Sequence, residues 1–118
     1  MSLLHDAYDP ETFRAQGHRL IDQLADFLTA TQHGEGPAIP WQEPDDAYAF
    51  WEAFAAGPSG PDELFGEVLA RSVRLHHPRY VGHQVGMPAP VTALAGLVSS
   101  LLNNGAAVWE MGMAATAM

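Results

Sequence analysis

The sequence predicts an all-α fold of three to four helices joined by Pro/Gly-rich loops. Two observations carry this prediction. Apolar residues recur at spacings of three and four, which is the period of an amphipathic helix. Proline and glycine clusters separate the periodic stretches. At two places a proline followed by acidic residues opens such a stretch, which is typical of a helix start.

The first helix is expected over about residues 10–31. Asp9 suits the N-cap, Pro10 the first helical position and Glu11 the first turn. The residues of its inner face follow at helical spacing: Phe13, Gly17, Leu20, Ile21, Leu24, Phe27 and Leu28. The residues before it, 1–8, are expected to be a short lead-in.

A linker, residues 32–46, comes next, and its three prolines favour an extended path. Asp45 or Asp46 is expected to cap a second helix over about residues 47–56. Three aromatic residues share one face of this helix and a fourth points elsewhere: Tyr48, Trp51 and Phe54, then Phe50. Such a cluster is more typical of a core or an interface than of a ligand cage.

The third helix is expected over about residues 61–75, after the break at residues 57–60. Pro61 and two acids open it, near the positive end of the helix dipole. Arg71 and Arg74 are expected in its last turn, where positive charge is favourable.

The last third of the chain is the most apolar. A helix over about residues 90–103 carries few polar side chains, so it is expected to be buried on most sides. It is too short for a transmembrane helix, which needs about 20 apolar residues, and it lacks basic flanks. Asn103 suits a left-handed helix end. Residues 106–110 are expected to be extended, and another helix is expected to start near Met113.

Composition excludes several classes of function. At 118 residues the chain is one domain at most, with 47% hydrophobic residues and a net charge of −9. Nucleic acid and anionic membrane surfaces are therefore unlikely partners, because both require clustered basic residues. There is no cysteine, and all five basic residues are arginine, so thiolate chemistry and a lysine Schiff base are excluded. The N-terminus has no secretory signal pattern, so a cytoplasmic protein is expected.

Two further groups of residues are only weak evidence for a metal site or a nucleophile. His77 and His83 could both reach a metal from a loop, but no nearby acid offers a third ligand, and structural histidines are favoured. A metal-dependent enzyme built on these two histidines is the weakest hypothesis. Ser99 and Ser100 lie inside an apolar helix without a Gly-x-Ser-x-Gly turn, so a serine nucleophile is disfavoured.

Three short blocks of the last third occur together in order: His77-Pro78-Arg79-Tyr80 with Gly82-His83-Gln84, then Leu101-Leu102-Asn103-Asn104 and Val108-Trp109-Glu110-Met111, then Ala114-Ala115-Thr116. This pattern resembles the start of the group II pyridoxal-phosphate-dependent amino acid decarboxylases, the family of the aromatic amino acid, glutamate, histidine and 2,4-diaminobutyrate decarboxylases. The resemblance spans essentially the whole chain, most loosely over the first helix.

The resemblance implies that the chain is like the N-terminal helical layer of a fold-type I decarboxylase, a homodimer whose active sites lie at the subunit interface. By this match, Tyr80, His83 and Gln84 line the pocket for the amino acid substrate. Ala107 and Trp109 are the matching candidates for contacts to the neighbouring subunit's pocket. The His83-Gln84 pair departs from both the aromatic-acid and the glutamate decarboxylase patterns, so the resemblance selects no substrate.

The resemblance also implies what this chain does not supply. Family members bind pyridoxal 5'-phosphate through a lysine, a stacked histidine, an aspartate and a phosphate cradle, in a large domain that matches no part of residues 1–118. No catalytic, cofactor-binding or metal-binding residue is therefore expected here, and no cofactor is expected bound to this chain alone. We expect an N-terminal dimerisation segment, inactive by itself. The alternative is a stand-alone helical module that forms homo-oligomers, because an apolar helix of this kind should seek a partner.

Overall fold

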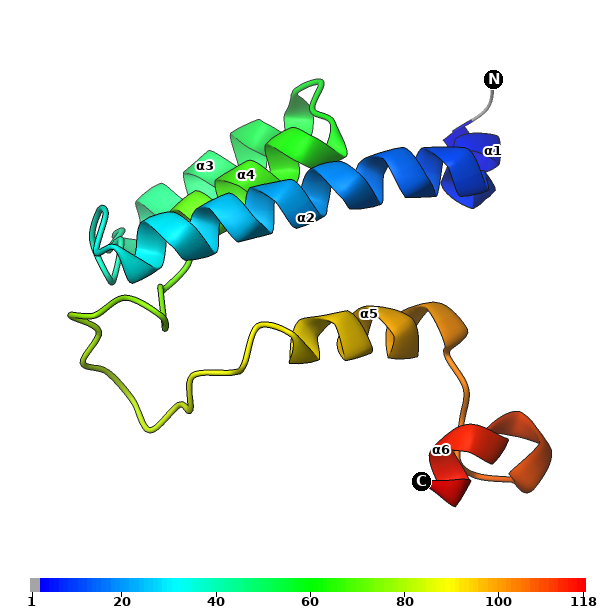
Figure 1. Cartoon of the computed structure of the whole chain (residues 1–118). Coiled ribbons are helices and arrows are strands. Elements are labelled where there is room, and N and C mark those ends of the chain that lie inside the picture. Colours follow the sequence, from blue (N-terminus) through cyan, green and yellow to red (C-terminus); the bar gives the residue numbers. More distant parts are fainter. Residues whose placement is uncertain (1–2) are drawn as a thin grey trace. The chain divides into compact units, whose positions relative to one another are not determined.

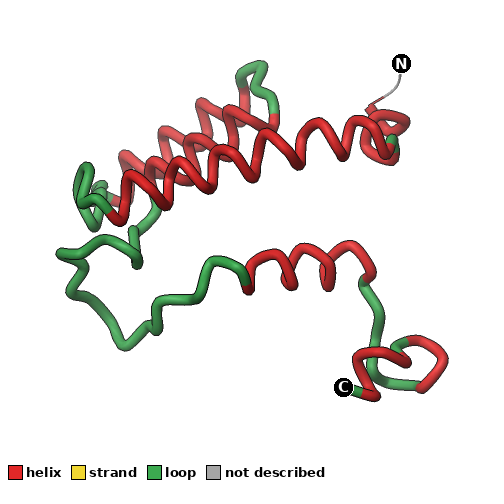
Figure 2. The backbone as a smooth tube through the Cα atoms, viewed as in Figure 1, coloured by secondary structure: helices red, strands yellow, loops and turns green. Residues whose placement is uncertain are grey.

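A computed structural model describes residues 3–118, and over this range the chain is all-helical, with no strand (Figures 1 and 2). The prediction of an all-α fold is confirmed. The chain divides into two compact units, Met1–His83 and Gln84–Met118. The length of the sequence predicts one domain at most. The first unit holds α1 (Leu3–Tyr8), α2 (Pro10–Gln32), α3 (Pro44–Ala56) and α4 (Pro61–Arg71).

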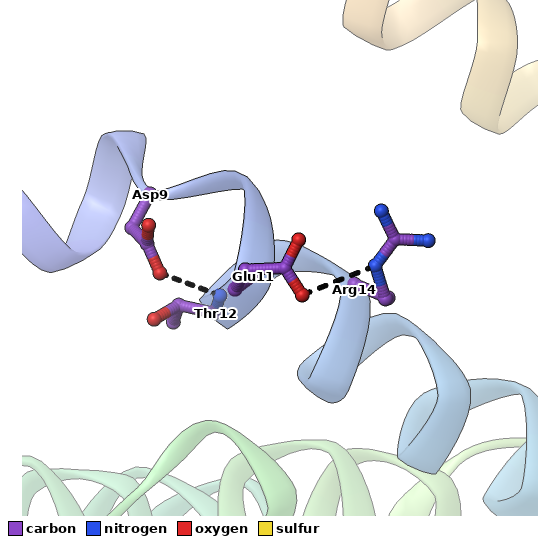
Figure 3. A network of polar contacts seen from close by, with 4 residues as sticks. All are labelled: Asp9, Glu11, Thr12 and Arg14. Atoms are coloured by element: carbon purple, nitrogen blue, oxygen red, sulfur yellow. Dashed lines mark hydrogen bonds and ion pairs between the residues drawn. The ribbon is translucent and has the colours of Figure 1, made fainter.

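The start of α2 follows the sequence prediction. Of the expected lead-in, residues 3–8 form the short helix α1, and residues 1–2 lie outside the described part of the chain. Asp9 is the N-cap, with extended backbone angles, and its carboxylate accepts a 2.7 Å hydrogen bond from the Thr12 amide (Figure 3). This bond holds the pKa of Asp9 below its ordinary value, because it stabilises the charged form. One turn on, Arg14 pairs with Glu11 at 3.3 Å (Figure 3).

Helix α3 begins at Pro44, earlier than expected, because Pro44 takes the first helical position. Glu43 is therefore the N-cap residue, and the expectation that Asp45 or Asp46 caps the helix is wrong; both lie in the first turn. The aromatic prediction also needs correction. Phe50 packs with Trp51 and Phe54, with ring centroids 5.2 and 6.0 Å away.

Helix α4 begins at Pro61 as predicted but ends at Arg71, not near residue 75. Ser72 is extended, and the Arg74 amide donates to the Ala38 carbonyl at 2.9 Å. Arg74 therefore lies outside the helix, contrary to prediction, because its backbone bonds to the linker. Arg71 does lie in the last turn, where it pairs with Glu67 at 3.1 Å.

Polar contacts tie the helices of this unit together. Arg19 of α2 pairs with Asp62 of α4 at 2.8 Å, and the Gln23 side chain donates to the Asp62 carbonyl at 3.1 Å. The Arg71 guanidinium lies 3.3 Å from the centroid of the Phe50 ring, which joins α4 to α3. Among the side chains that the structure describes, no apolar one is fully buried. The unit is therefore held by half-buried apolar faces together with these polar contacts.

The second unit contains α5 (Thr92–Leu102), a 3-10 turn η1 (Trp109–Met111) and α6 (Met113–Ala117). Helix α5 is slightly shorter than predicted, and it ends at Asn103 in the left-handed conformation, as expected. The predicted extended stretch 106–110 is wrong at its end, where Trp109 begins η1. The predicted burial of α5 is wrong as well. All its residues are exposed, because nothing in its own unit covers it.

No helix in the described part of the chain combines the length and the apolar character that crossing a bilayer requires. Helix α5, at 11 residues, is well short of the roughly 20 needed.

Candidate functional site

The base of the predicted pocket loop is organised around His77. This side chain is 3% exposed, and Thr31 is the only other buried polar residue among those whose burial the structure describes. Its Nε2 lies 3.1 Å from the Gly36 carbonyl oxygen, which belongs to the linker after α2. Its Nδ1 accepts a hydrogen bond of 3.1 Å from the Arg79 amide. The ring thus joins two segments about forty residues apart in the sequence.

These two partners fix the form of the imidazole. A backbone amide only donates, so Nδ1 carries the lone pair, and a carbonyl only accepts, so Nε2 carries the proton. His77 is therefore the neutral tautomer with its hydrogen on Nε2. Both ring nitrogens are engaged by backbone groups, and neither offers a lone pair to a metal ion. The interpretation of His77 as a structural histidine is the one that this geometry supports.

Two glycines shape the linker that receives His77. Gly34 and Gly36 both have positive φ, 77° and 70°, a region that L-residues with a Cβ disfavour. The Arg74 guanidinium lies directly over Gly36 and donates from Nη1 to the Glu35 carbonyl at 2.6 Å. Sequence reasoning placed these glycines in a linker and Arg74 in a helix, so it missed the junction between them.

Tyr80 is the one predicted pocket residue with a defined tertiary setting. Its amide donates to the His77 carbonyl at 2.9 Å, which closes a tight turn around Pro78. Its side chain is half-buried and folds over Gly82 so closely that a Cβ at Gly82 would collide with the phenol oxygen and ring. A residue with a side chain at position 82 would therefore displace Tyr80.

His83 and Gln84 lie beyond this contact in an irregular, fully exposed stretch, residues 81–90. The boundary between the two units falls between these two residues. Neither side chain has a described hydrogen bond that fixes its direction. The structure therefore orders the base of the predicted pocket loop more tightly than its tip.

Ala107 and Trp109 belong to the second unit and are exposed; Trp109 is 57% exposed. They lie in the turn that leads into η1 and α6. Gly112, buried against the Gly105 carbonyl, closes this turn.

An open groove of about 410 Å³ lies elsewhere on the first unit, between the linker, α3 and the end of α4. Ile39, Trp41 and Trp51 give it an apolar lining, with Arg71 at its wall. The indole nitrogen of Trp41 donates to Glu43 at 3.1 Å. None of the predicted pocket residues lines this groove, so it is separate from the loop.

The residues of this chain do not fit a complete site for pyridoxal phosphate. A Schiff base needs a lysine amine, and the sequence contains no lysine. Within residues 3–118, no group of three His, Cys, Asp or Glu side chains is placed to hold a metal ion.

No protein-family model, curated protein or solved structure matches this chain.

Proposed function

We propose that this chain is the N-terminal helical segment of a pyridoxal-phosphate-dependent amino acid decarboxylase, in which it serves dimer formation and supplies one wall of the substrate pocket. The observation that carries the proposal is the uncovered apolar surface of α5. Leu101 is 67% exposed and Leu97 45%, in a helix whose only polar residues are Thr92, Ser99 and Ser100. Burying a leucine side chain is worth about 1.5–3 kcal/mol, so such a helix strongly favours a covering surface.

The loop that begins at His77 supports the second part of the proposal. Its base is tied to the linker, and His83 and Gln84 at its tip are exposed. Binding residues are commonly carried on loops that a rigid scaffold holds at one end. The order of the residue blocks in the sequence supports the same assignment.

In this proposal the chain does not perform the bond-breaking step. When bound in the complete enzyme, pyridoxal phosphate supplies the electron sink for loss of the carboxylate. Tyr80 and the side chains at the loop tip would contact the substrate, and Trp109 would contact the neighbouring subunit's pocket. A cytoplasmic location belongs to the proposal as well.

A second function is favoured by the same surface of α5: a stand-alone helical module that forms homo-oligomers. The two proposals differ in whether a cofactor domain accompanies the chain. Reading the coding DNA on both sides of these codons separates them. We expect a continuous reading frame that encodes a large domain with a Schiff-base lysine. A stop codon, with no such domain in the locus, would overturn the decarboxylase proposal.

Association through α5 is tested on the chain itself by sedimentation velocity over a range of concentrations. Leu101→Gln is expected to weaken self-association about tenfold or more, because the leucine loses an apolar contact. Val81→Gln is the matched control, since Val81 is also apolar and 90% exposed but lies outside α5. A monomer at every concentration would contradict self-association, and equal effects of both variants would contradict the assignment to α5.

A further inference from the structure

We infer that His77 is a positioning residue, whose imidazole fixes the start of the pocket loop by tying it to the Gly34–Gly36 turn. The role of the loop as a pocket wall rests on the proposed function, whereas the tie itself rests on the geometry. His77 is 3% exposed and makes contacts to both segments through opposite edges of one ring. A hydrogen bond shielded from water in this way is stronger than one at the surface.

The tie reaches Tyr80 through consecutive backbone contacts. The Arg79 amide bonds to the His77 ring, and the next amide, that of Tyr80, bonds to the His77 carbonyl. Pro78, which lies between His77 and Arg79, has a fixed φ and lies close to Gly34. Three successive residues are therefore set by His77, and the Tyr80 side chain then closes over Gly82. The direction in which the loop leaves the first unit follows from the orientation of one imidazole.

Arg74 forms a second tie that is parallel to the first but chemically different. Its amide donates to the Ala38 carbonyl and its guanidinium donates to the Glu35 carbonyl. This tie holds the linker against the chain just before His77 and does not reach residues 79–82. The Arg74 amide therefore reports the linker, whereas the Arg79 amide reports the loop base.

The two edges of the ring can be replaced one at a time. In His77→Asn the side-chain oxygen takes the place of Nδ1 and can accept from the Arg79 amide, but nothing reaches Gly36. In His77→Gln the amide nitrogen takes the place of Nε2 and can donate to the Gly36 carbonyl, but the acceptor for Arg79 is lost. Together, the two variants separate the local bond to the Arg79 amide from the long-range bond to the Gly36 carbonyl.

The experiment is NMR on the full 118-residue chain. In the unsubstituted protein, the ¹⁵N shifts of the His77 ring should show a bare Nδ1 and a protonated Nε2, and the Tyr80 ring should shift the Gly82 α-protons upfield. In His77→Asn the Arg79 amide should keep its protection from hydrogen exchange, while the Arg74 amide exchanges about fivefold faster. In His77→Gln the Arg74 amide should keep its protection, while the Arg79 amide exchanges about fivefold faster. The upfield shift at Gly82 should also be lost.

Three results would overturn the inference. The first is a wild-type ring protonated on Nδ1, which needs no variant to observe. The second is unchanged exchange at both amides in both variants. The third is a loss of helical CD signal in both variants, which would make His77 a residue needed for folding. None of these readouts involves a cofactor, a substrate or a second subunit, so a failure of the decarboxylase proposal would leave them unchanged.

Discussion

Replacing Gly36 by alanine tests the turn that holds the linker against the loop base. Gly36 has a φ of 70°, and a Cβ built there would lie 2.7 Å from Nη1 of Arg74. The substitution therefore combines backbone strain with a collision. Gly34→Ala is the matched control, because its φ of 77° carries the same strain while its Cβ would make only ordinary contacts, 3.4 Å to Pro78 and 3.9 Å to the His77 ring.

The magnitudes follow from these contacts. A left-handed conformation costs an L-residue about 1–2 kcal/mol, so Gly34→Ala should destabilise the closed turn by about that amount. Gly36→Ala should cost about 1 kcal/mol more, because the guanidinium must move and its hydrogen bond to the Glu35 carbonyl is lost. The guanidinium is the far end of a flexible side chain, so the collision itself adds little beyond that bond.

Native-state hydrogen exchange at the Arg74 amide, which bonds to the Ala38 carbonyl, measures opening of this turn. About 1–2 kcal/mol corresponds to roughly 5- to 30-fold faster exchange in Gly34→Ala, and Gly36→Ala should exchange about fivefold faster again. With Arg74→Ala as background the backbone amide at position 74 is still present, and the difference in its exchange between the two glycine variants should vanish. Equal exchange of the two variants in the presence of Arg74 would refute the reasoning.

Three other predictions concern α2. Gly17→Ala should raise the free energy of unfolding by about 0.5–1 kcal/mol in urea titrations, since a Cβ there meets no atom within 4 Å; a lower stability would contradict this. The pKa of Asp9 is lowered, so its stabilisation of the helix is present above its ordinary value of 3.8 and is lost as the pH falls through the lower folded value. CD should show this acid loss of helix, and Asp9→Asn, which caps without titrating, should remove that step; an unchanged titration would count against the cap. A double-mutant cycle with Arg19→Ala and Asp62→Asn should give a coupling free energy of about 0.5 kcal/mol, because the pair is half-exposed. Salt at about 1 M should reduce this coupling, and a coupling that salt leaves unchanged would speak against an ion pair.

Local signals predicted the helix starts. Asp9 and Pro10 fix the beginning of α2, and Pro61 fixes that of α4, because caps and proline act within one turn. At Pro44 the same rule applied, but the residue was read as part of an extended linker. The end of α4 was not predictable in this way. Its helical pattern continues past Arg71, and a bond from the Arg74 amide to the linker overrides it.

In the candidate site, too, residues that the sequence can single out differ from those whose role depends on a long-range contact. Only the family resemblance selects Tyr80, His83 and Gln84, and their role in a substrate pocket stays a prediction; the structure places all three in the loop after α4. The role of His77 could not be selected, because it depends on the Gly36 carbonyl, 41 residues away. No spacing rule connects a histidine to a backbone oxygen at such a distance; only the folded linker brings them together.

The absence of a fully buried apolar side chain among those described has a thermal consequence. The heat capacity of unfolding arises mainly from apolar surface that folding removes from water, and here that surface is small for the length of the chain. The stability of the isolated chain should therefore change little with temperature, and its melting should be broad. The proposed association through α5 would bury apolar surface that folding leaves in contact with water. A calorimetric titration should then show a heat-capacity change of association that is large beside that of folding.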